Sequence, residues 1–433
     1  MVASVVICGI TCALMIASIL FFPKITIKGH EINTYWIITL IGAAAILLSH
    51  TADISAVSEA LTADTAINPL KILVLFISMT VLSIFLDEVG FFSYLAAVTL
   101  EKAGRSQFTL FLYLYGIVSI LTVFTSNDII ILTFTPFICY FAKNASISPM
   151  PYLFAEFIAA NTWSMALIIG NPTNIYLATA NDIGFLDYFV KMILPTLTAG
   201  IVSFTVLFLI FKKQLSQPIL PAKAKAEIKD RLLLYVGIAH LGLCTALLAV
   251  SSYIHIEMYY VSLGFAVSLA VWVLIISAAR KRKPVELIEC LKRSPWALIP
   301  FVLSMFVLIL SLSQNGVTQK IDDIISQGDE VFSFGVTSFA SANIINNIPM
   351  SVLFSSIAEP LTGAAKTRAI YASVVGSNIG AVLTPVGALA GIMWSSILRF
   401  QKVKFGFGDF VKYGAAVSVP TILATLTVLD IEL

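Results

Sequence analysis

The chain has 433 residues, of which 59% are hydrophobic and only 12% charged, and its mean hydropathy is +0.96. Soluble domains carry about 25% charged residues, so this composition excludes an ordinary soluble protein and indicates a helical protein with many membrane spans. The formal net charge of +2 says little by itself. The distribution of charge along the chain is more informative, because it reports membrane orientation.

Apolar runs of about 20 residues can cross a bilayer as helices. We expect helices at roughly 2–22, 33–50, 71–100, 150–180, 186–211, 231–252, 257–279, 295–313, 367–399 and 409–430. Two further apolar segments, 107–143 and 331–358, are interrupted by polar residues, and each is predicted to be a re-entrant hairpin. The second segment, of 28 residues, is too short for two full spans. The first is longer, so two separate crossings remain an alternative for it.

The basic residues predict the orientation of these spans. With the N-terminus outside and each hairpin returning to its side of entry, all but five of the 26 Lys and Arg residues lie in cytoplasmic segments. The five on the outer side are Lys71, Lys191, Lys320, Lys366 and Arg368. This bias is what the positive-inside rule describes. We therefore expect a multi-pass protein of the plasma (or bacterial inner) membrane, surrounded by the lipid bilayer.

The two halves of the chain carry recurring landmarks. An Asn and a Gly nine positions apart interrupt an apolar run in each half, Asn161 with Gly170 and Asn378 with Gly387. A Pro and a Gly 21 positions apart also recur, Pro69 with Gly90 and Pro295 with Gly316. Each half then holds five helices and one hairpin, and because five is odd the second copy is inverted. The sequence thus predicts an all-α integral membrane protein of two inverted repeats, 1–212 and 231–433, with broken helices at the midplane and a cytoplasmic linker at 213–230.

Four polar breaks inside the apolar runs resemble the starts of half-helices. They are Ser126–Asn127–Asp128 and Asn346–Asn347 at the hairpin tips, and Asn171–Pro172 and Thr384–Pro385 in the broken helices. An Asn or Thr cap followed by Pro is a helix-start signature. Helix N-termini carry about half a positive charge and suit an anion or a small hydroxylated solute. The amide and hydroxyl oxygens, with unwound carbonyl groups, would instead suit Na⁺.

Polar side chains within these runs are the candidate site residues, since they are costly in a membrane unless they line an enclosed cavity. The candidate substrate-binding residues are Asn127, Asn161, Asn171, Asn346, Asn347, Asn378 and Thr384. Asp128 is the candidate for proton coupling, although it could instead only cap a half-helix. Glu156 could bind a cation or a proton, or its long side chain could reach the cytoplasmic interface. Asp87 and Glu88, just before Gly90, could mark a helix kink or a proton relay.

The tip and break motifs resemble those of the ion transporter superfamily that includes ArsB arsenite exporters, NhaD-type sodium/proton antiporters and dicarboxylate/sodium symporters. The ArsB-like motifs are Ser126–Asn127–Asp128 followed by Thr135–Pro136, then Asn343-x-x-Asn346–Asn347-x-Pro349, Gly376-x-Asn378-x-Gly380, Thr384–Pro385-x-Gly387-x-Leu389–Ala390 and Trp394. Gly170–Asn171–Pro172–Thr173–Asn174 resembles an element shared more broadly by ArsB- and NhaD-like permeases. The resemblance implies two hairpins and two broken helices around a central site. It also implies proton-coupled export of arsenite or antimonite, in some cases with a cytosolic ATPase subunit.

The leading functional hypothesis is proton-coupled efflux of arsenite or antimonite by alternating access, with the Asn amides binding the hydroxyl groups of a small inorganic solute. The alternatives are a Na⁺/H⁺ antiporter of the NhaD type and a sodium-coupled organic or inorganic anion carrier. A passive channel is a further alternative, and an integral membrane enzyme is disfavoured because no nucleophile–base arrangement accompanies the breaks. We expect no cofactor, no resident metal and no nucleic-acid partner. The coupling ion is predicted to be H⁺, with Na⁺ as the alternative, and oligomerisation remains open.

Overall fold

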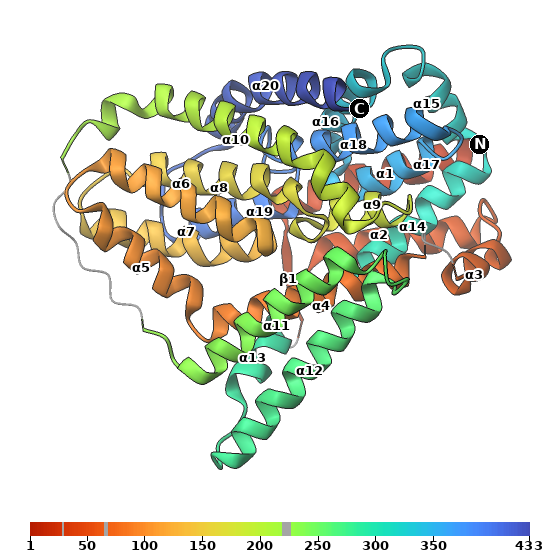
Figure 1. The fold of residues 1–433 in the computed structure, drawn as a ribbon. Helices are drawn as coiled ribbons and strands as arrows, with labels where there is room; N and C mark the ends of the chain where they lie inside the picture. Colours follow the sequence, from red (N-terminus) through yellow and green to blue (C-terminus); the bar gives the residue numbers. More distant parts are fainter. Residues whose placement is uncertain (28–29, 65–67, 219–226) are drawn as a thin grey trace.

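The computed structural model describes residues 1–27, 30–64, 68–218 and 227–433, and this part of the chain is helical almost throughout (Figure 1). The first half contains α1 (Val2–Phe21), β1 (Lys24–Ile27), β2 (His30–Asn33), α2 (Thr34–Leu48), α3 (Ile54–Thr62), α4 (Pro69–Glu88), α5 (Phe91–Ala103), α6 (Gln107–Phe124), α7 (Asn127–Asn144), α8 (Met150–Trp163), the short 3₁₀ segments η1 (Ser164–Ala166) and η2 (Ile168–Gly170), α9 (Pro172–Thr179) and α10 (Phe185–Leu215). The predicted linker at 213–230 lies partly outside the described residues.

The second half follows with a similar order of long, short and interrupted helices. It contains α11 (Arg231–Val250), α12 (Met258–Ala279), α13 (Val285–Arg293), α14 (Leu298–Gln314), α15 (Val317–Ile325), α16 (Glu330–Ile345), α17 (Asn347–Ile357), α18 (Gly363–Gly380), α19 (Leu389–Phe400) and α20 (Phe407–Glu432). Within the described residues, eight helices are long and apolar enough to cross a membrane. The chain is a multi-pass, all-α membrane protein, as its composition predicts.

The two predicted hairpin segments are each divided where the sequence turns polar. In the first, α6 ends at Phe124 and α7 begins at Asn127. In the second, α16 ends at Ile345 and α17 begins at Asn347. The two helices of each pair contact one another, and Figure 1 shows α7 doubling back alongside α6. The break positions are therefore confirmed, whereas re-entry from one face of a membrane stays a prediction.

The single helix predicted at 71–100 is wrong, because the structure breaks it at Gly90. α4 ends at Glu88 and α5 starts at Phe91, with Gly90 between them at φ +87°. Gly316 occupies the same place between α14 and α15, at φ +69°. A left-handed φ is open to glycine without a steric cost, so each glycine lets the chain change direction between two helices. The Pro–Gly spacing of 21 therefore marks an equivalent junction in both halves.

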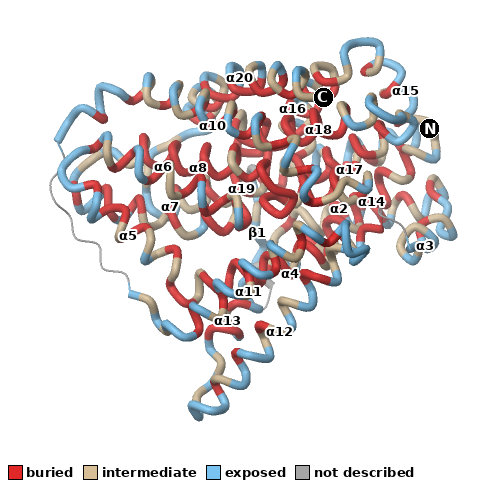
Figure 2. The backbone as a smooth tube through the Cα atoms, viewed as in Figure 1, coloured by how far each residue is buried: buried red, intermediate tan, exposed pale blue. Residues whose placement is uncertain are grey.

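Burial is high in the interrupted helices and in α4, and low in the long helices α10, α11 and α12 (Figure 2). Residues Pro151 to Thr162 of α8 and Ala369 to Gly380 of α18 are all buried. By contrast, the long helices α10, α11 and α12 leave large apolar side chains such as Ile201, Leu243 and Val267 exposed. Apolar surface of this kind is suited to lipid. The polar residues of the breaks consequently lie inside the protein, away from the lipid-facing surface.

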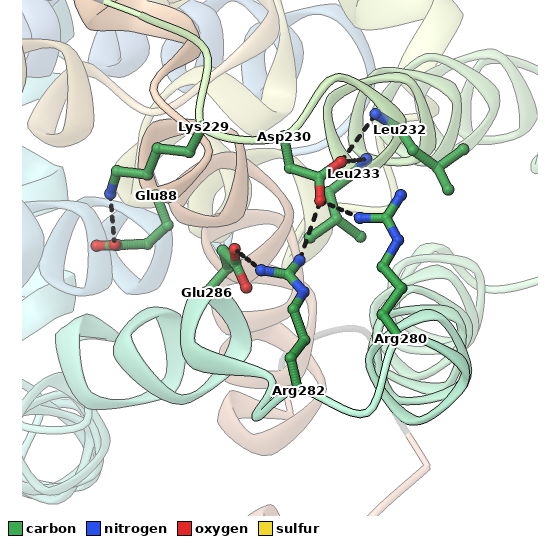
Figure 3. A network of polar contacts seen from close by, with 8 residues as sticks. All are labelled: Glu88, Lys229, Asp230, Leu232, Leu233, Arg280, Arg282 and Glu286. Carbon is green, nitrogen blue, oxygen red and sulfur yellow. Dashed lines mark hydrogen bonds and ion pairs between the residues drawn. The ribbon is translucent and has the colours of Figure 1, made fainter.

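A charged junction holds the start of α11 against the turn between α12 and α13 (Figure 3). Asp230 accepts hydrogen bonds from the backbone N–H groups of Leu232 and Leu233 at 3.0 and 3.2 Å, and it therefore caps α11. The same carboxylate pairs with Arg280, and with Arg282 at 3.1 Å. These contacts fix two lipid-facing helices to one another at the end that carries the basic residues.

Candidate functional site

The first interrupted helix is shaped by a glycine and a cap. α8 ends at Trp163, two 3₁₀ turns follow, and α9 begins at Pro172. A Cβ on Gly170 would lie 2.1 Å from the backbone oxygen of Ser164, so only glycine fits at this close approach. Asn171 then caps α9, with its Oδ1 accepting the Thr173 N–H at 3.2 Å. The helix start predicted at Asn171–Pro172 is confirmed.

The break of the first half is joined to α18 of the second half by a buried network of amide groups. Asn378 Oδ1 accepts from Asn171 Nδ2 at 3.1 Å and lies 2.9 Å from the Ser164 hydroxyl. Asn378 Nδ2 donates to Asn174 Oδ1 at 2.7 Å and to the Val374 carbonyl oxygen at 2.9 Å. Both lone pairs and both protons of this amide are thus engaged. Asn378 therefore holds the two halves together in this conformation.

A hydroxyl pair adds to the same contact between the two halves. Ser377 Oγ donates to Thr173 Oγ1 at 2.8 Å, directly beside the Asn171–Asn378 bond. Asn174 also donates to the carbonyl oxygens of Ser164 and Leu167, which stabilises the unwound segment before α9. Sequence reasoning missed Ser164, Thr173 and Ser377 as site residues. Their adjacency to the predicted breaks is the signal that could have found them.

The tip of the first hairpin is tied to α8 through another Asn pair. Asn127 Nδ2 donates to Asn161 Oδ1 at 3.1 Å, and Asn161 Nδ2 donates to the Phe157 carbonyl oxygen at 2.8 Å. Asn127 Oδ1 accepts the Asp128 N–H at 3.0 Å. Ser126 precedes the helix, but its buried hydroxyl has no hydrogen-bond partner in the described structure. The half-buried Asp128 carboxylate likewise makes no hydrogen bond or ion pair with another described residue.

The tip of the second hairpin packs against the break between α18 and α19. Asn346, at φ +74°, caps α17 and donates through Nδ2 to the Val386 carbonyl oxygen at 2.8 Å. The backbone N–H of Asn347 donates to the Gly387 carbonyl oxygen at 3.0 Å. The side-chain amide of Asn347 makes no hydrogen bond to another described residue, although the residue is only 2% exposed. This amide is therefore available to a ligand.

The half-helix start predicted at Thr384–Pro385 is wrong. Residues 381–388 form turns, and α19 begins only at Leu389 with Ala388 as its capping position. The Thr384 hydroxyl instead donates to Asn343 Oδ1 at 2.7 Å, across to the first arm of the hairpin. The Gly387 carbonyl accepts from the Asn347 N–H, so the segment passes around the hairpin tip as a series of turns before the helix begins.

The structure thus sorts the seven predicted substrate-binding residues into two groups. Asn127, Asn161, Asn171 and Asn378 lie along one chain of contacts, because the Ser164 hydroxyl is 2.9 Å from both the Asn161 carbonyl oxygen and Asn378 Oδ1. Asn346, Asn347 and Thr384 lie around the second hairpin tip. Among the described residues, no hydrogen bond joins the second group to the first.

Glu156 does not reach an interface, so that alternative is wrong. Its side chain is fully buried between helices, and the Thr135 hydroxyl lies 2.9 Å from Oε1 and 3.1 Å from Oε2. Asp87 and Glu88 lie at the end of α4, where Arg293 of α13 pairs with both carboxylates, with Asp87 at 2.7 Å. Thr133 of α7 also donates to Asp87 at 2.8 Å. A helix interruption at this point is confirmed, and the acids serve to join α4, α7 and α13.

The interior polar groups are predominantly neutral amides and hydroxyls. In the described part of the chain, no group of three or more His, Cys, Asp and Glu residues could hold a metal ion. The hydrogen bonds of the two groups of site residues involve amides, hydroxyls and backbone atoms, with no Lys or Arg among the described partners. Amides both donate and accept, so this arrangement is suited to a neutral solute that carries hydroxyl groups.

Comparisons with known proteins identify the family. The family model described as citrate transporter, CitMHS, matches residues 25–370. The chain belongs to this family. It is 28% identical over 432 residues to an arsenical pump membrane protein of Escherichia coli, covering 94% of this chain and 95% of the relative. It is 26% identical to an arsenical pump membrane protein of Yersinia enterocolitica, covering 83% and 85%. The predicted resemblance to ArsB-type permeases is confirmed.

A solved structure supports the architecture of this member of the citrate transporter family. The YdaH transporter of Alcanivorax borkumensis, whose crystal structure is described as having an unusual topology, superposes with a TM-score of 0.60. The match covers 99% of this chain and 97% of the other at 14% sequence identity. At this identity the likeness shows the fold alone. Fold and family together establish a membrane transporter.

Proposed function

We propose that this chain is a secondary transporter that exports arsenite or antimonite, as the neutral trihydroxides, in exchange for protons. Relatives named arsenical pump membrane protein, matched over nearly their whole length, support the substrate class. The chemistry of the breaks supports a neutral solute, because amides and hydroxyls can satisfy its hydroxyl groups without a counter-charge. The whole activity requires no cofactor and no catalytic step.

The observation that carries this proposal is the position of unused hydrogen-bonding capacity. The Ser126 hydroxyl is buried and has no hydrogen-bond partner among the described residues, and a buried polar group left unpaired costs about 1–3 kcal/mol, so it indicates a missing partner. The Asp128 carboxylate and the Asn347 amide, whose polar atoms are not fully buried, bond to no described residue and lie at the hairpin tips with Ser126. Solute hydroxyls would supply that partner. Asn171 and Asn378, whose amides bond to each other, would instead hold the two halves in register.

Asp128 is the proposed coupling residue. Its carboxylate is half-buried at the first hairpin tip and forms no ion pair with a described residue, so it can exchange a proton with water. Protonation would remove the cost of moving a charge through the protein during alternating access. Exchange of a neutral solute for one proton gains about 1.4 kcal/mol per pH unit. It gains a further ~2.3 kcal/mol per 100 mV of membrane potential.

Two other transport functions make different use of the same residues. In a Na⁺/H⁺ antiporter, Asp128 and the amide oxygens would bind Na⁺. The family description as citrate transporter favours an anion carrier as the other alternative. In such a carrier, the N-termini of α9 and α17 would face the carboxylate groups of the substrate. The neutral character of the polar groups favours the trihydroxide over a tricarboxylate, which would need basic partners.

Everted membrane vesicles distinguish these functions. We expect energised vesicles to accumulate arsenite and to lose it when a protonophore is added, with no proton release on addition of Na⁺. Asp128→Asn should abolish accumulation, whereas the matched control Asp323→Asn, on an exposed position of α15, should retain it. Proton release on adding Na⁺ without arsenite uptake would replace the proposal with an antiporter. Citrate uptake without arsenite uptake would replace it with an anion carrier.

A further inference from the structure

A second carboxyl group lies in a wholly buried pocket beside the first hairpin. Glu156 of α8 and Thr135 of α7 are both 0% exposed, and the Thr135 hydroxyl lies within hydrogen-bond distance of both carboxylate oxygens. A hydroxyl has one proton, so it donates to one of these oxygens at a time. The contact therefore links the second arm of the hairpin directly to an acidic side chain of the broken helix.

The third side of this pocket is Trp394 of α19. Its indole N–H is buried and has no hydrogen-bond partner, yet it lies close enough to Glu156 to interact with the carboxylate. The indole ring is enclosed by aromatic rings. Its ring centroid lies 5.1 Å from that of Phe157, 5.5 Å from Phe405 and 5.6 Å from Phe410. This enclosure makes the surroundings of Glu156 apolar.

The pocket contains no counter-charge for Glu156. Among the described residues, the groups that interact with its carboxyl are Thr135 and Cys139 from α7 and Trp394 from α19, and none of them is basic. No titratable or charged group of the described parts of α6, α10 or α18 bonds to it. A buried carboxylate without a paired cation carries a desolvation penalty of several kcal/mol. Apolar burial thus favours the protonated carboxyl.

The Thr135 hydroxyl acts in the opposite direction. An ionised carboxylate only accepts hydrogen bonds, and Thr135 O–H donates one to it, whereas the nearby Trp394 N–H makes no hydrogen bond to a described residue. One hydroxyl donor contributes less than the desolvation penalty, so the packed carboxyl keeps its proton. An N–H group beside the carboxyl also disfavours a metal cation, which would need several oxygen ligands. Release of the proton therefore depends on whether α7 and α19 stay packed against α8.

We propose that Glu156 is a second proton-binding site of this transporter, whose occupancy follows the packing of the first hairpin against α8. The inference rests on the proposed proton-coupled function. When α7 withdraws on one face and water reaches the carboxyl, its O–H bond breaks and the proton leaves to that water. When the carboxylate is opened to the other face, it takes a proton from water there, the O–H bond forms again and α7 packs against α8. A cavity of about 250 Å³ is lined by Arg399 and by Phe405 and Phe410, two of the rings that pack on Trp394, and it ends short of Trp394 and Glu156 in the packed structure.

Infrared difference spectroscopy on the purified full chain tests this site without arsenite. Solvent-exposed carboxyls are ionised between about pH 6 and about pH 9, so a protonated-carboxyl band in this range reports a buried acid. We expect one such band to disappear as the pH rises, to be absent from Glu156→Gln, and to persist in Asp128→Asn and in the exposed control Glu101→Gln. Thr135→Val, which removes a donor to the ionised form, should keep the band to higher pH. A Glu156 band that is absent throughout, or unchanged throughout, would overturn the proposal.

Transport measurements distinguish an error in this inference from an error in the proposed function. We expect Glu156→Gln, whose amide resembles the protonated carboxyl, to retain arsenite counterflow but to lose at least tenfold in proton-driven accumulation. Wild-type protein without any arsenite transport would defeat the proposed function, while the infrared band would still decide the role of Glu156. Full proton-driven accumulation by Glu156→Gln would defeat this inference alone.

Discussion

Asn171 Nδ2 donates a hydrogen bond to Asn378 Oδ1 at 3.1 Å, although the two residues are 207 positions apart. Asn171 caps α9 after the break of the first half, and Asn378 lies close to the end of α18 at Gly380. The interrupted helix of each half thus contributes one amide group to this bond. The bond lies between the two halves that alternating access would move. Substitutions at and around this bond can therefore test separately what stabilises the protein and what transports the substrate.

Truncation of Asn378 should strongly destabilise the protein. Asn378→Ala removes four hydrogen bonds and leaves the amides of Asn171 and Asn174 short of partners in a buried site. Each unsatisfied buried group costs about 1–3 kcal/mol. Thermal unfolding in detergent should show a clear loss relative to Asn181→Ala, which removes a half-buried amide that bonds to Leu177 and Ser355. Equal unfolding temperatures of the two variants would contradict the structural role of Asn378.

The glycine at the first break should be intolerant of any side chain. Gly170→Ala places a Cβ 2.1 Å from the Ser164 carbonyl oxygen, so the unwound segment must shift and the adjacent amide network with it. We expect little folded protein, measured as the monodisperse fraction after detergent extraction. The matched control is Gly116→Ala in α6, where a Cβ meets nothing within 4 Å. That variant should be neutral or stabilised by about 1 kcal/mol, and a similar yield of both would count against the close approach of Gly170 to Ser164.

The two adjacent Asn residues at the second hairpin tip should behave differently. Asn346→Ala loses the cap of α17 and the bond to Val386, and it forces alanine to φ +74°, so it should lower stability by about 1–3 kcal/mol. Asn347→Ala removes an amide that bonds to no described residue, so it should leave stability nearly unchanged and weaken arsenite transport. Unfolding temperature and the KM of arsenite uptake measure the two effects. An Asn347→Ala variant with an unchanged KM would remove Asn347 from the binding site.

The charged junction at Asp230 should contribute stability that depends on pH. Burial raises the pKa of Asp230, but the Leu233 N–H and the Arg280 guanidinium outweigh it and hold the pKa below its ordinary value. A carboxyl with a lowered folded-state pKa stabilises the fold above its unfolded pKa of about 3.9, and that contribution is lost as the pH falls through the folded-state value.

Comparison of wild type with Asp230→Asn isolates this contribution, because Asn retains the helix cap but not the charge. The wild type should unfold at a higher temperature at neutral pH, and the difference should shrink as the pH is lowered below about 4. The exposed substitution Asp323→Asn should show no comparable trend. A difference that stays constant down to acidic pH would mean that the ion pairs with Arg280 and Arg282 contribute nothing measurable.

Much of this architecture is readable in the sequence, because a membrane imposes simple rules on composition. The hairpin breaks at Asn127 and Asn346 and the cap at Asn171 follow from polar and capping residues inside apolar runs. The sequence offers a kink near Gly90 only as an alternative to one continuous helix, since a glycine in an apolar run is compatible with either until tertiary contacts select φ +87°. Gly316 marks the same kind of junction in the second half, so the Pro–Gly spacing that recurs in both halves predicts the turn better than the apolar run does.

The partners of the site residues could not be predicted, because they depend on tertiary packing. Thr384 precedes a proline as a helix cap does, yet its hydroxyl bonds to Asn343 and the helix begins further along the chain, at Leu389. Glu156 has a side chain long enough to reach an interface, and it is enclosed by the packing of several helices on α8, including α7, α6 and α10. Composition and periodicity describe one helix at a time, whereas these outcomes depend on several helices together.

Reconstituted proteoliposomes with an imposed pH gradient and no membrane potential test the central claim most directly. For exchange of one proton for one neutral trihydroxide, the steady-state arsenite ratio should rise about tenfold for each pH unit of gradient. Asp128→Asn should flatten this dependence while Asp323→Asn preserves it. An arsenite ratio that stays at unity whatever the gradient would contradict proton-coupled export by this protein.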